Sequence, residues 1–341
     1  MICPHCDQSL LQRERTGRTC SKCNRQFALD PRTNTLRLSD VRIRRIVAKL
    51  TDDGRTRITV NQLWYALTRK QTKRGNGRAG AVGCLAAGLP VALVLLIGGL
   101  SAGAGVVALL GALLGVVTTL VYVSSFRRGH RAVEAHPLSH FRSTSMSLWT
   151  SVYGSLPSGV VDERTFRHPE PPARPRAVLL CADASIAAFL AANGIPKRYA
   201  LALVTRADQV APGSVPVIVL HDADVTGCRL AAATRAALPG RRVVDAGLPP
   251  RAVMNAPGAV PVRGPRPPAG ALAPLRAGRT LTDAELEWLA KGWSSPLGAV
   301  PPAKLLSAVT RVVERVTGAK DAEAAKAEAV GFLTWPGEAA S

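Results

Sequence analysis

Four cysteines near the start of the chain have the spacing of a metal site. Cys3 and Cys6 form one C-x2-C pair, and Cys20 and Cys23 form a second pair after thirteen intervening residues. Each pair turns two thiolates toward one centre, and two pairs complete a tetrahedron that suits zinc. Four protein ligands leave no open position, so the spacing predicts a structural zinc ion in a small β ribbon over residues 1–33. Two disulfides are the alternative, which a cytoplasmic location disfavours.

A second group of reactive side chains lies in the segment HDADVTG, residues 221–227, directly after an apolar run. Side chains at the carboxyl end of a parallel strand point into the ligand crevice of the sheet. Carboxylates there are hard oxygen ligands, so Asp222 and Asp224 are candidate Mg²⁺ ligands. The alternative is that they cap the helix that follows. Gly227 is expected to let the chain turn sharply into that helix.

The elements that must position these carboxylates are short and regular. Apolar runs predict four strands, and two alanine-rich segments between them predict helices. Nearly continuous apolar strands are typical of a parallel sheet that is covered on both faces. The region is therefore expected to be a compact α/β, Rossmann-like domain. The predicted strands cover residues 177–181, 199–204, 215–220 and 242–245, and the predicted helices cover 184–192 and 227–238.

This order of elements, with D-x-D-x-x-G after the third strand, resembles the Toprim fold, above all in type IIB topoisomerase A subunits and related nucleases. The resemblance covers residues 177–248, about a fifth of the chain. It implies that Asp222 and Asp224 bind Mg²⁺ for phosphodiester chemistry on nucleic acid. The family also carries a glutamate at the end of the first strand, which acts as acid or base and as a metal partner. Here Ala182 stands at that position, and Asp183, one residue later, is the candidate third catalytic carboxylate.

An uncharged segment separates the cysteines from this domain. Residues 79–126 include no charged side chain, a run of 48. One helix of that length would measure about 72 Å, more than twice the apolar core of a bilayer. We therefore expect a transmembrane hairpin with spans near 81–98 and 105–123, joined by the glycine-rich stretch between them. A buried pair of core helices is the alternative.

The residues beside this run predict its orientation. Because basic residues flank it on both sides, the positive-inside rule places both flanks in the cytoplasm. The expected location is the inner (plasma) membrane, with both chain ends cytoplasmic. Gly111-x3-Gly115 fits the small-residue pattern of closely packed helices. The flanking basic residues are Lys73, Arg74 and Arg78 before the run, and Arg127, Arg128 and Arg131 after it.

Basic residues are concentrated at the start of the chain. The formal net charge is +21, and residues 1–80 hold 18 of the 44 basic but only 6 of the 23 acidic side chains. Such a region can face nucleic acid or an anionic membrane surface. Aromatic residues make up only 4%, which disfavours a large stacking platform for single strands. Residues 34–78 are expected to form two short helices with basic faces.

The remaining segments are predicted from local patterns. Residues 127–176 are expected to form an extended connector, and 249–341 a Pro/Gly/Ala-rich loop followed by helices. Within the latter, a capping box at Thr282 opens one helix, residues 304–316 form an amphipathic helix, and 321–330 form a solvated one. Cys84, Cys181 and Cys228 have no partner at ligand spacing, so we expect them to be small buried residues.

Two functions from different classes follow. The first is a membrane-anchored, Mg²⁺-dependent enzyme with nuclease-type activity on nucleic acid, favoured by the intact D-x-D-x-x-G. The second is a catalytically degenerate scaffold that recruits a cytoplasmic protein partner to the membrane, favoured by Ala182. The sequence identifies no small-molecule substrate.

Overall fold

The computed structural model describes residues 1–34, 36–75, 78–101, 103–134, 137–256, 259 and 261–318, without the side chains of 69–89, 108, 121–136 and 269. The predicted helix over 321–330 therefore lies outside the described residues. The chain divides into two compact units. Unit 1 comprises Met1–Asp40 and Trp64–Tyr153, and unit 2 comprises Val41–Leu63 and Gly154–Ser341.

Unit 1 begins with the cysteine module. Single antiparallel bridges join Ile2 to Ser9 and Thr19 to Gln26, and the helical segment η1 (Gln12–Arg18) lies between them. Each bridge brings the two ends of one cysteine knuckle together. The module buries Cys3, Cys20, Leu10 and Phe27 in a small core.

One buried carboxylate joins the cysteine module to the rest of unit 1. Asp40, the first residue of α1 (Asp40–Thr51), is fully buried and accepts hydrogen bonds of 2.8 Å from the backbone N–H groups of Ala28 and Leu29. The hydroxyl of Tyr153, the last residue of α6 (Ser147–Tyr153), also donates to Asp40. A buried carboxylate needs such donors because burial removes its hydration. The cysteine module is thereby fixed to α6.

The connector is only partly extended, contrary to prediction. Its first part is helical, with α5 (Leu138–Phe141), a π turn (Arg142–Met146) and α6. Phe141, Met146 and Trp149 are buried there, so tertiary packing supports helix in a segment with weak local signals. Residues 154–176, where the prolines cluster, are extended or irregular and include the short strand β2 (Val160–Val161).

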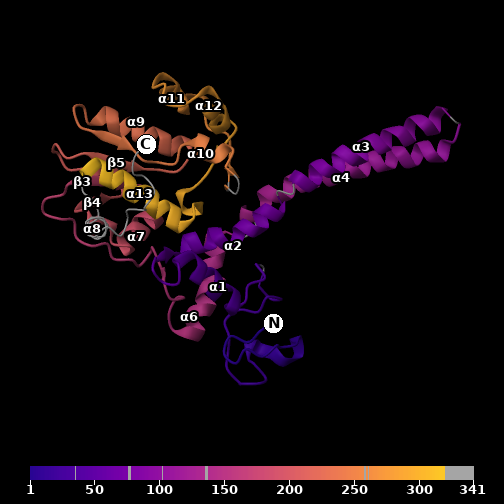
Figure 1. Ribbon diagram of the computed structural model, residues 1–341, viewed down its shortest axis with the longest axis horizontal. Coiled ribbons are helices and arrows are strands. Elements are labelled where there is room, and N and C mark those ends of the chain that lie inside the picture. The colour runs from indigo at the N-terminus through magenta and orange to yellow at the C-terminus, as the bar shows by residue number, and fades with distance from the viewer. Residues whose placement is uncertain are drawn as a thin grey trace, which may run out of the picture. The chain divides into compact units, whose positions relative to one another are not determined.

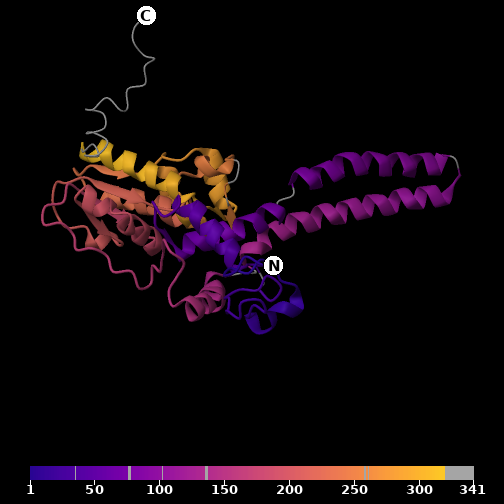
Figure 2. The same cartoon turned by 60° about the horizontal axis from the view of Figure 1, so that its bottom comes forward.

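The uncharged segment forms a pair of helices joined by a short turn. It follows α2 (Val60–Gly75), and its two long helices, α3 (Arg78–Ser101) and α4 (Gly105–Glu134), lie side by side in both views (Figures 1 and 2). Gly111 lies at their seam, where an added Cβ would come within 2.6 Å of the Leu96 nitrogen and 2.8 Å of the Ala92 oxygen. The close backbone contact therefore requires glycine at this position, which confirms the predicted role of Gly111.

The hairpin buries small residues and exposes large ones. Ala92, Gly99 and Gly111 are buried at the seam. Among the described residues, no helix is both long enough and apolar enough to cross a membrane. The large apolar side chains of α3 and α4 that are exposed are Val91, Leu93, Val94, Leu95, Ile97, Leu100, Val106, Val107, Leu109, Leu110, Leu113, Val116, Val117 and Leu120.

Unit 2 is built on a four-stranded parallel sheet, as predicted. Its strand order is β4-β3-β5-β6, with Val178 paired to both Ala202 and Val217. Each strand matches a predicted apolar run to within two residues at either end. The strands are β3 (Ala177–Cys181), β4 (Leu201–Val204), β5 (Val217–Leu220) and β6 (Val243–Asp245), connected by α7 (Ala184–Ala192), α8 (Ile195–Arg198) and α9 (Val225–Ala237).

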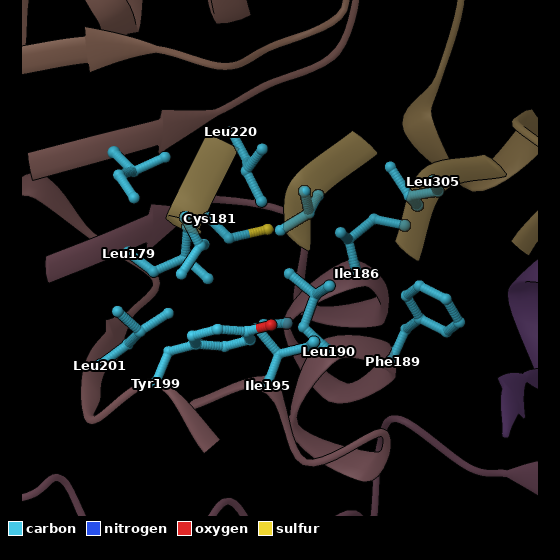
Figure 3. Close-up of a cluster of buried hydrophobic side chains, with 14 of the residues drawn as sticks. Leu179, Cys181, Ile186, Phe189, Leu190, Ile195, Tyr199, Leu201, Leu220 and Leu305 are labelled. Atoms are coloured by element: carbon cyan, nitrogen blue, oxygen red, sulfur yellow. The ribbon is translucent and has the colours of Figure 1, made fainter. Parts of the chain in front are cut away.

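Helices cover both faces of this sheet (Figure 1). Leu179 and Cys181 point into one core with α7 and with α13 (Pro302–Thr317), and Figure 3 shows the Cys181 thiol among the apolar side chains there. Val178 and Leu180 point to the opposite face, where they pack with Ala231 of α9. Burial raises the pKa of the Cys181 and Cys228 thiols, which confirms that both behave as buried small residues. The side chain of Cys84 lies outside the described part of the chain.

The chain then adds short elements around the sheet. The predicted capping box is present, because Thr282 Oγ1 accepts from the Glu285 N–H and Glu285 Oε2 accepts from the Thr282 N–H. Glu285 also pairs with Arg251, which joins α12 to α10. The remaining elements are α10 (Pro250–Met254), α11 (Ala273–Ala277), α12 (Asp283–Ala290), the pair β1 (Ile58–Thr59) with β2, the pair β7 (Val262–Arg263) with β8 (Trp293–Ser294), and turns at Ala207–Gln209, Ala269–Ala271 and Leu297–Ala299.

Candidate functional site

The four cysteines form one cluster. All of their Sγ atoms lie within 4.8 Å of one another, with Cys3 and Cys23 at 3.8 Å and Cys6 and Cys20 at 3.9 Å. His5, inside the first knuckle, instead donates a 2.7 Å hydrogen bond from Nε2 to the Gln26 carbonyl. The site can therefore hold a metal ion with four sulfur ligands, and His5 has the role of a knuckle spacer.

Hydrogen-bond donors favour thiolate at one cysteine of the cluster. Burial opposes the charged form of Cys20, but hydrogen bonds from the Cys23 and Lys22 backbones and from the Cys3 and Cys23 side chains bring the Cys20 pKa to about 7. The Lys22 N–H donates to Cys20 Sγ at 3.4 Å. Burial raises the pKa of Cys3, and the pKa of Cys6 is raised to about 12, so Cys20 is favoured as thiolate, the metal-binding form, and Cys3 and Cys6 are not.

The three predicted carboxylates lie at one edge of the parallel sheet. Asp183 follows β3, and Asp222 and Asp224 follow β5, the strand paired with β3. The connection after β3 leads to one side of the sheet and that after β5 to the other, which makes this the crevice where ligands bind in open α/β sheets. Ala182 and the three carboxylates line one cavity of about 600 Å³.

Each carboxylate uses one oxygen for a backbone N–H group. Asp183 Oδ1 accepts from Ser185 N at 2.7 Å, and Asp224 Oδ1 accepts from Gly227 N at 2.6 Å, so both cap the helices that follow them. The alternative interpretation of helix capping is thus correct for Asp224 but wrong for Asp222, and the cap formed by Asp183 was not predicted. Asp222 Oδ1 accepts from Leu297 N at 2.8 Å. All these bonds leave the Oδ2 atoms unused.

The carboxylates share a cavity without converging on one point. In the described part of the chain, the four cysteines are the only set of three or more candidate ligands whose ligand atoms all lie within 4.8 Å of one another. Ala182 is exposed at the same cavity. The methyl group of alanine can neither transfer a proton nor bind a metal.

The negative charges nevertheless influence one another. Burial raises the pKa of Asp222 to about 6, and the charges of Asp183 and Asp224 act in the same direction. Burial also raises the pKa of Asp183, although the N–H groups of Ser185 and Ile186 oppose that shift. Asp222 therefore lies in a concentration of negative charge that a bound cation would relieve.

A buried histidine beside these carboxylates was not predicted as a site residue. The His221 ring donates from Nδ1 to the Asp222 carbonyl at 2.7 Å and from Nε2 to Asp245 Oδ1 at 2.9 Å. A carbonyl and an ionised carboxylate only accept hydrogen bonds, so both ring nitrogens carry protons and the ring is charged. Burial opposes that charge, but the bonds to Asp245 and Asp222 outweigh it and raise the His221 pKa. Burial acts against ionised Asp245 in the same way, but its bond to His221 leaves the Asp245 pKa lowered.

Two glycines make room for the His221 ring. A Cβ on Gly227 would lie 2.8 Å from Nδ1, and a Cβ on Gly247 would overlap Cδ2 and Nε2. The expected role of Gly227 in a sharp turn is therefore wrong, since Gly227 lies inside α9 and is needed for close packing. The sequence places each of His221 and Asp245 at the end of an apolar run, but only the strand order brings these two ends together.

A distant segment fixes the HDAD motif from the other side. Ala223 and Ser295 exchange backbone hydrogen bonds of 2.9 and 3.0 Å, and Leu297 supplies the N–H for Asp222. Leu297 is itself buried in the core beside α7 and α13. The orientation of Asp222 thus depends on residues about 75 positions further along the chain.

Comparisons with known protein families, with curated proteins and with solved structures gave no match to this chain. Any function must therefore be inferred from the residues and their geometry.

We predict that Asp222→Asn stabilises the metal-free protein above pH 6. The folded-state pKa of about 6 lies above the ordinary value of 3.8, so the unfolded chain loses this proton first as pH rises. Stability is then lost between pH 4 and 6, and the penalty for charged Asp222 persists above that window. At about 1.4 kcal/mol per pKa unit, the neutral amide gains up to about 3 kcal/mol, less about 1 kcal/mol for a weaker bond to Leu297.

Urea unfolding with a chelator present, at pH 4 and pH 7.5, measures this difference. Asp208→Asn, a change of an exposed carboxylate, is the matched control and should alter stability by less than about 0.5 kcal/mol. An Asp222→Asn protein less stable than the parent at pH 7.5 would contradict the prediction.

Proposed function

We propose that this protein is a membrane-anchored scaffold with a zinc-bound cysteine module and a catalytically degenerate Toprim-like domain. In this proposal the domain binds a divalent cation and recruits a cytoplasmic protein partner, but does not cleave phosphodiesters. The observation that carries the proposal is the exposed Ala182 in the carboxylate cavity.

Cleavage requires a group that Ala182 cannot supply. Metal-dependent phosphodiester hydrolysis uses ions to position and polarise the phosphate, and an acid or base to move a proton. Asp183 is the nearest substitute in sequence, but its Oδ1 caps α7 through bonds of 2.7 and 3.3 Å. Proton transfer by Asp183 would therefore fall to its Oδ2 alone.

Cation binding requires fewer protein groups than catalysis does. Mg²⁺ is commonly held by one or two carboxylates and several waters. Asp222 and Asp224 each have an unused Oδ2 and line the same cavity. The raised pKa of Asp222 supports this assignment, because a divalent cation would offset the crowded negative charge.

Mg²⁺-dependent nuclease-type activity on nucleic acid is the second candidate. It is favoured by Asp183, which lines the same cavity as Asp222 and Asp224. Burial raises the pKa of Asp183, and an acid with a pKa nearer neutral pH is better suited to proton transfer. In that case Asp222 and Asp224 bind the metal, and Asp183 acts as the third carboxylate.

One experiment separates these two functions. We expect the full-length protein to bind Mn²⁺, with an affinity at least tenfold lower in Asp222→Asn/Asp224→Asn, because both ligand oxygens of the cavity lose their charge. Mn²⁺ binding is followed by electron paramagnetic resonance. Supercoiled plasmid and RNA are incubated in parallel with Mg²⁺, Mn²⁺ or chelator.

We expect neither protein to cleave these substrates. Metal-dependent cleavage by the parent and not by the double variant would establish the nuclease instead. Asp208→Asn serves as the control for a change of surface charge. If the parent binds no Mn²⁺, the cation site is wrong.

The cysteine module is proposed to hold zinc. Four sulfur ligands at mutual contact distance, with N–H donors to sulfur, fit a closed tetrahedral site. Such an ion would stabilise the module and take no part in chemistry, because no coordination position stays open. Its binding would favour the folded knuckles over the unfolded chain.

We predict stoichiometric zinc in the purified protein, measured by elemental mass spectrometry. Cys20→Ser should lose the metal, because a hydroxyl is a poor zinc ligand. Cys228→Ser is the matched control and should keep it, since Cys228 is buried in a different cluster, in unit 2. Two disulfides, or a different metal in the purified parent, would refute the assignment.

Membrane anchoring is proposed from the surface of the hairpin. Among the described residues, the exposed large apolar side chains belong to α3 and α4, apart from Ile2 and Leu11. They occur at neighbouring positions such as Leu93, Val94 and Leu95, so they cover more than one face. Small residues inside and large apolar residues outside suit a lipid environment. With basic residues on both flanks, the proposed location is the inner (plasma) membrane, with both chain ends cytoplasmic.

We predict that Leu113→Arg weakens membrane association and Leu11→Arg does not. The two leucines are equally exposed, at 56% and 58%. A bilayer penalises arginine by about 2.5–3.5 kcal/mol at the centre of a span, whereas water tolerates it. The measurement is the fraction of full-length protein that stays with membranes after alkaline extraction. Equal fractions for both variants would contradict a bilayer around α4.

A further inference from the structure

We propose that His221 is a positioning residue for the cation site of Asp222 and Asp224. This inference rests on the proposed cation binding and adds a residue that holds the backbone of the ligand Asp222 and not its carboxylate.

The ring of His221 has one well-defined position. Its side chain is only 4% exposed, and both nitrogens donate hydrogen bonds to acceptors on different elements. The Gly227 and Gly247 backbones lie too close to leave space for even a methyl group between them and the ring. A ring enclosed this tightly cannot move without moving the chain around it.

His221 connects the ends of two neighbouring strands. Nδ1 holds the carbonyl of Asp222, directly after β5, and Nε2 holds the carboxylate of Asp245, the last residue of β6. The His221 carbonyl also accepts from Leu248 N at 2.9 Å. The backbone that carries the proposed ligands is therefore fixed relative to β6 through this side chain.

The other supports of this backbone act on neighbouring residues. The Ala223 N–H donates to the Ser295 carbonyl, and the Ala223 carbonyl accepts from the Ser295 N–H. Asp222 Oδ1 accepts from the Leu297 N–H. Among these supports, His221 holds the Asp222 peptide itself, one bond from the ligand's Cα. Second-layer hydrogen bonds of this kind commonly alter metal affinity by ten- to a hundredfold.

Asp245 anchors the ring from its outer side. Its Oδ1 lies 2.9 Å from Nε2, and the Asp245 side chain is 42% exposed whereas that of His221 is buried. The ring therefore holds the Asp222 backbone from inside the fold.

The experiment measures Mn²⁺ affinity and thermal stability of the full-length protein with two disruptive variants. Gly247→Ala forces the ring out of place, and His221→Phe keeps a ring but removes both hydrogen bonds. Gly240→Ala is the matched control: its φ of +78° strains alanine, but no atom lies within 4 Å of the new methyl group. Gly240→Ala therefore lowers stability without reaching His221.

We expect the Mn²⁺ dissociation constant to rise at least tenfold in Gly247→Ala and His221→Phe, and to stay within twofold of the parent in Gly240→Ala. If either disruptive variant fails to fold, the other still decides the outcome. Unchanged affinity in the folded disruptive variants, even with lower melting temperatures, would show a merely structural histidine and overturn the inference while the cation site stands. A parent that binds no Mn²⁺ would overturn both.

Discussion

The parallel pairing of β3 with β5 is the constraint on which the candidate site of unit 2 depends. It brings the carboxyl ends of two strands to one edge, although Asp183 and Asp222 are far apart in the sequence. The two connections then leave toward opposite faces of the sheet, so a cavity opens between them.

At the same edge, helix capping and metal binding compete for the carboxylate oxygens. Backbone N–H groups at helix starts need acceptors, and Asp183 and Asp224 supply them for α7 and α9. An oxygen used in this way is less free to bind a metal. Asp222, which instead holds Leu297, is the carboxylate whose pKa rises to about 6. Two of the three carboxylates therefore cap helices, and the third, Asp222, holds a distant backbone N–H group and has a pKa raised to about 6.

Local sequence patterns predicted the strands and the cysteine cluster but not the distant contacts that hold the site residues in place. Apolar runs located all four strands, and the metal spacing located the four cysteines, because both signals lie within a few residues. The roles of His221 and Asp245 needed the strand order, which places β6 beside β5. The bond from Leu297 to Asp222 needed the path of a segment about 75 residues away. The helices of the connector depend on burial of Phe141 and Trp149, which periodicity alone did not reveal.

The hairpin in unit 1 reverses the packing rule that unit 2 obeys. The sheet of unit 2 buries large apolar residues such as Leu179 and Ile218, whereas the hairpin buries Ala92 and Gly111 and exposes leucines and valines. In water the hydrophobic effect would oppose the second arrangement, because the large side chains are exposed. In the proposed membrane location, lipid would remove that cost, and close backbone packing would hold the helices together. Under that proposal, one physical rule applied in two solvents accounts for both arrangements.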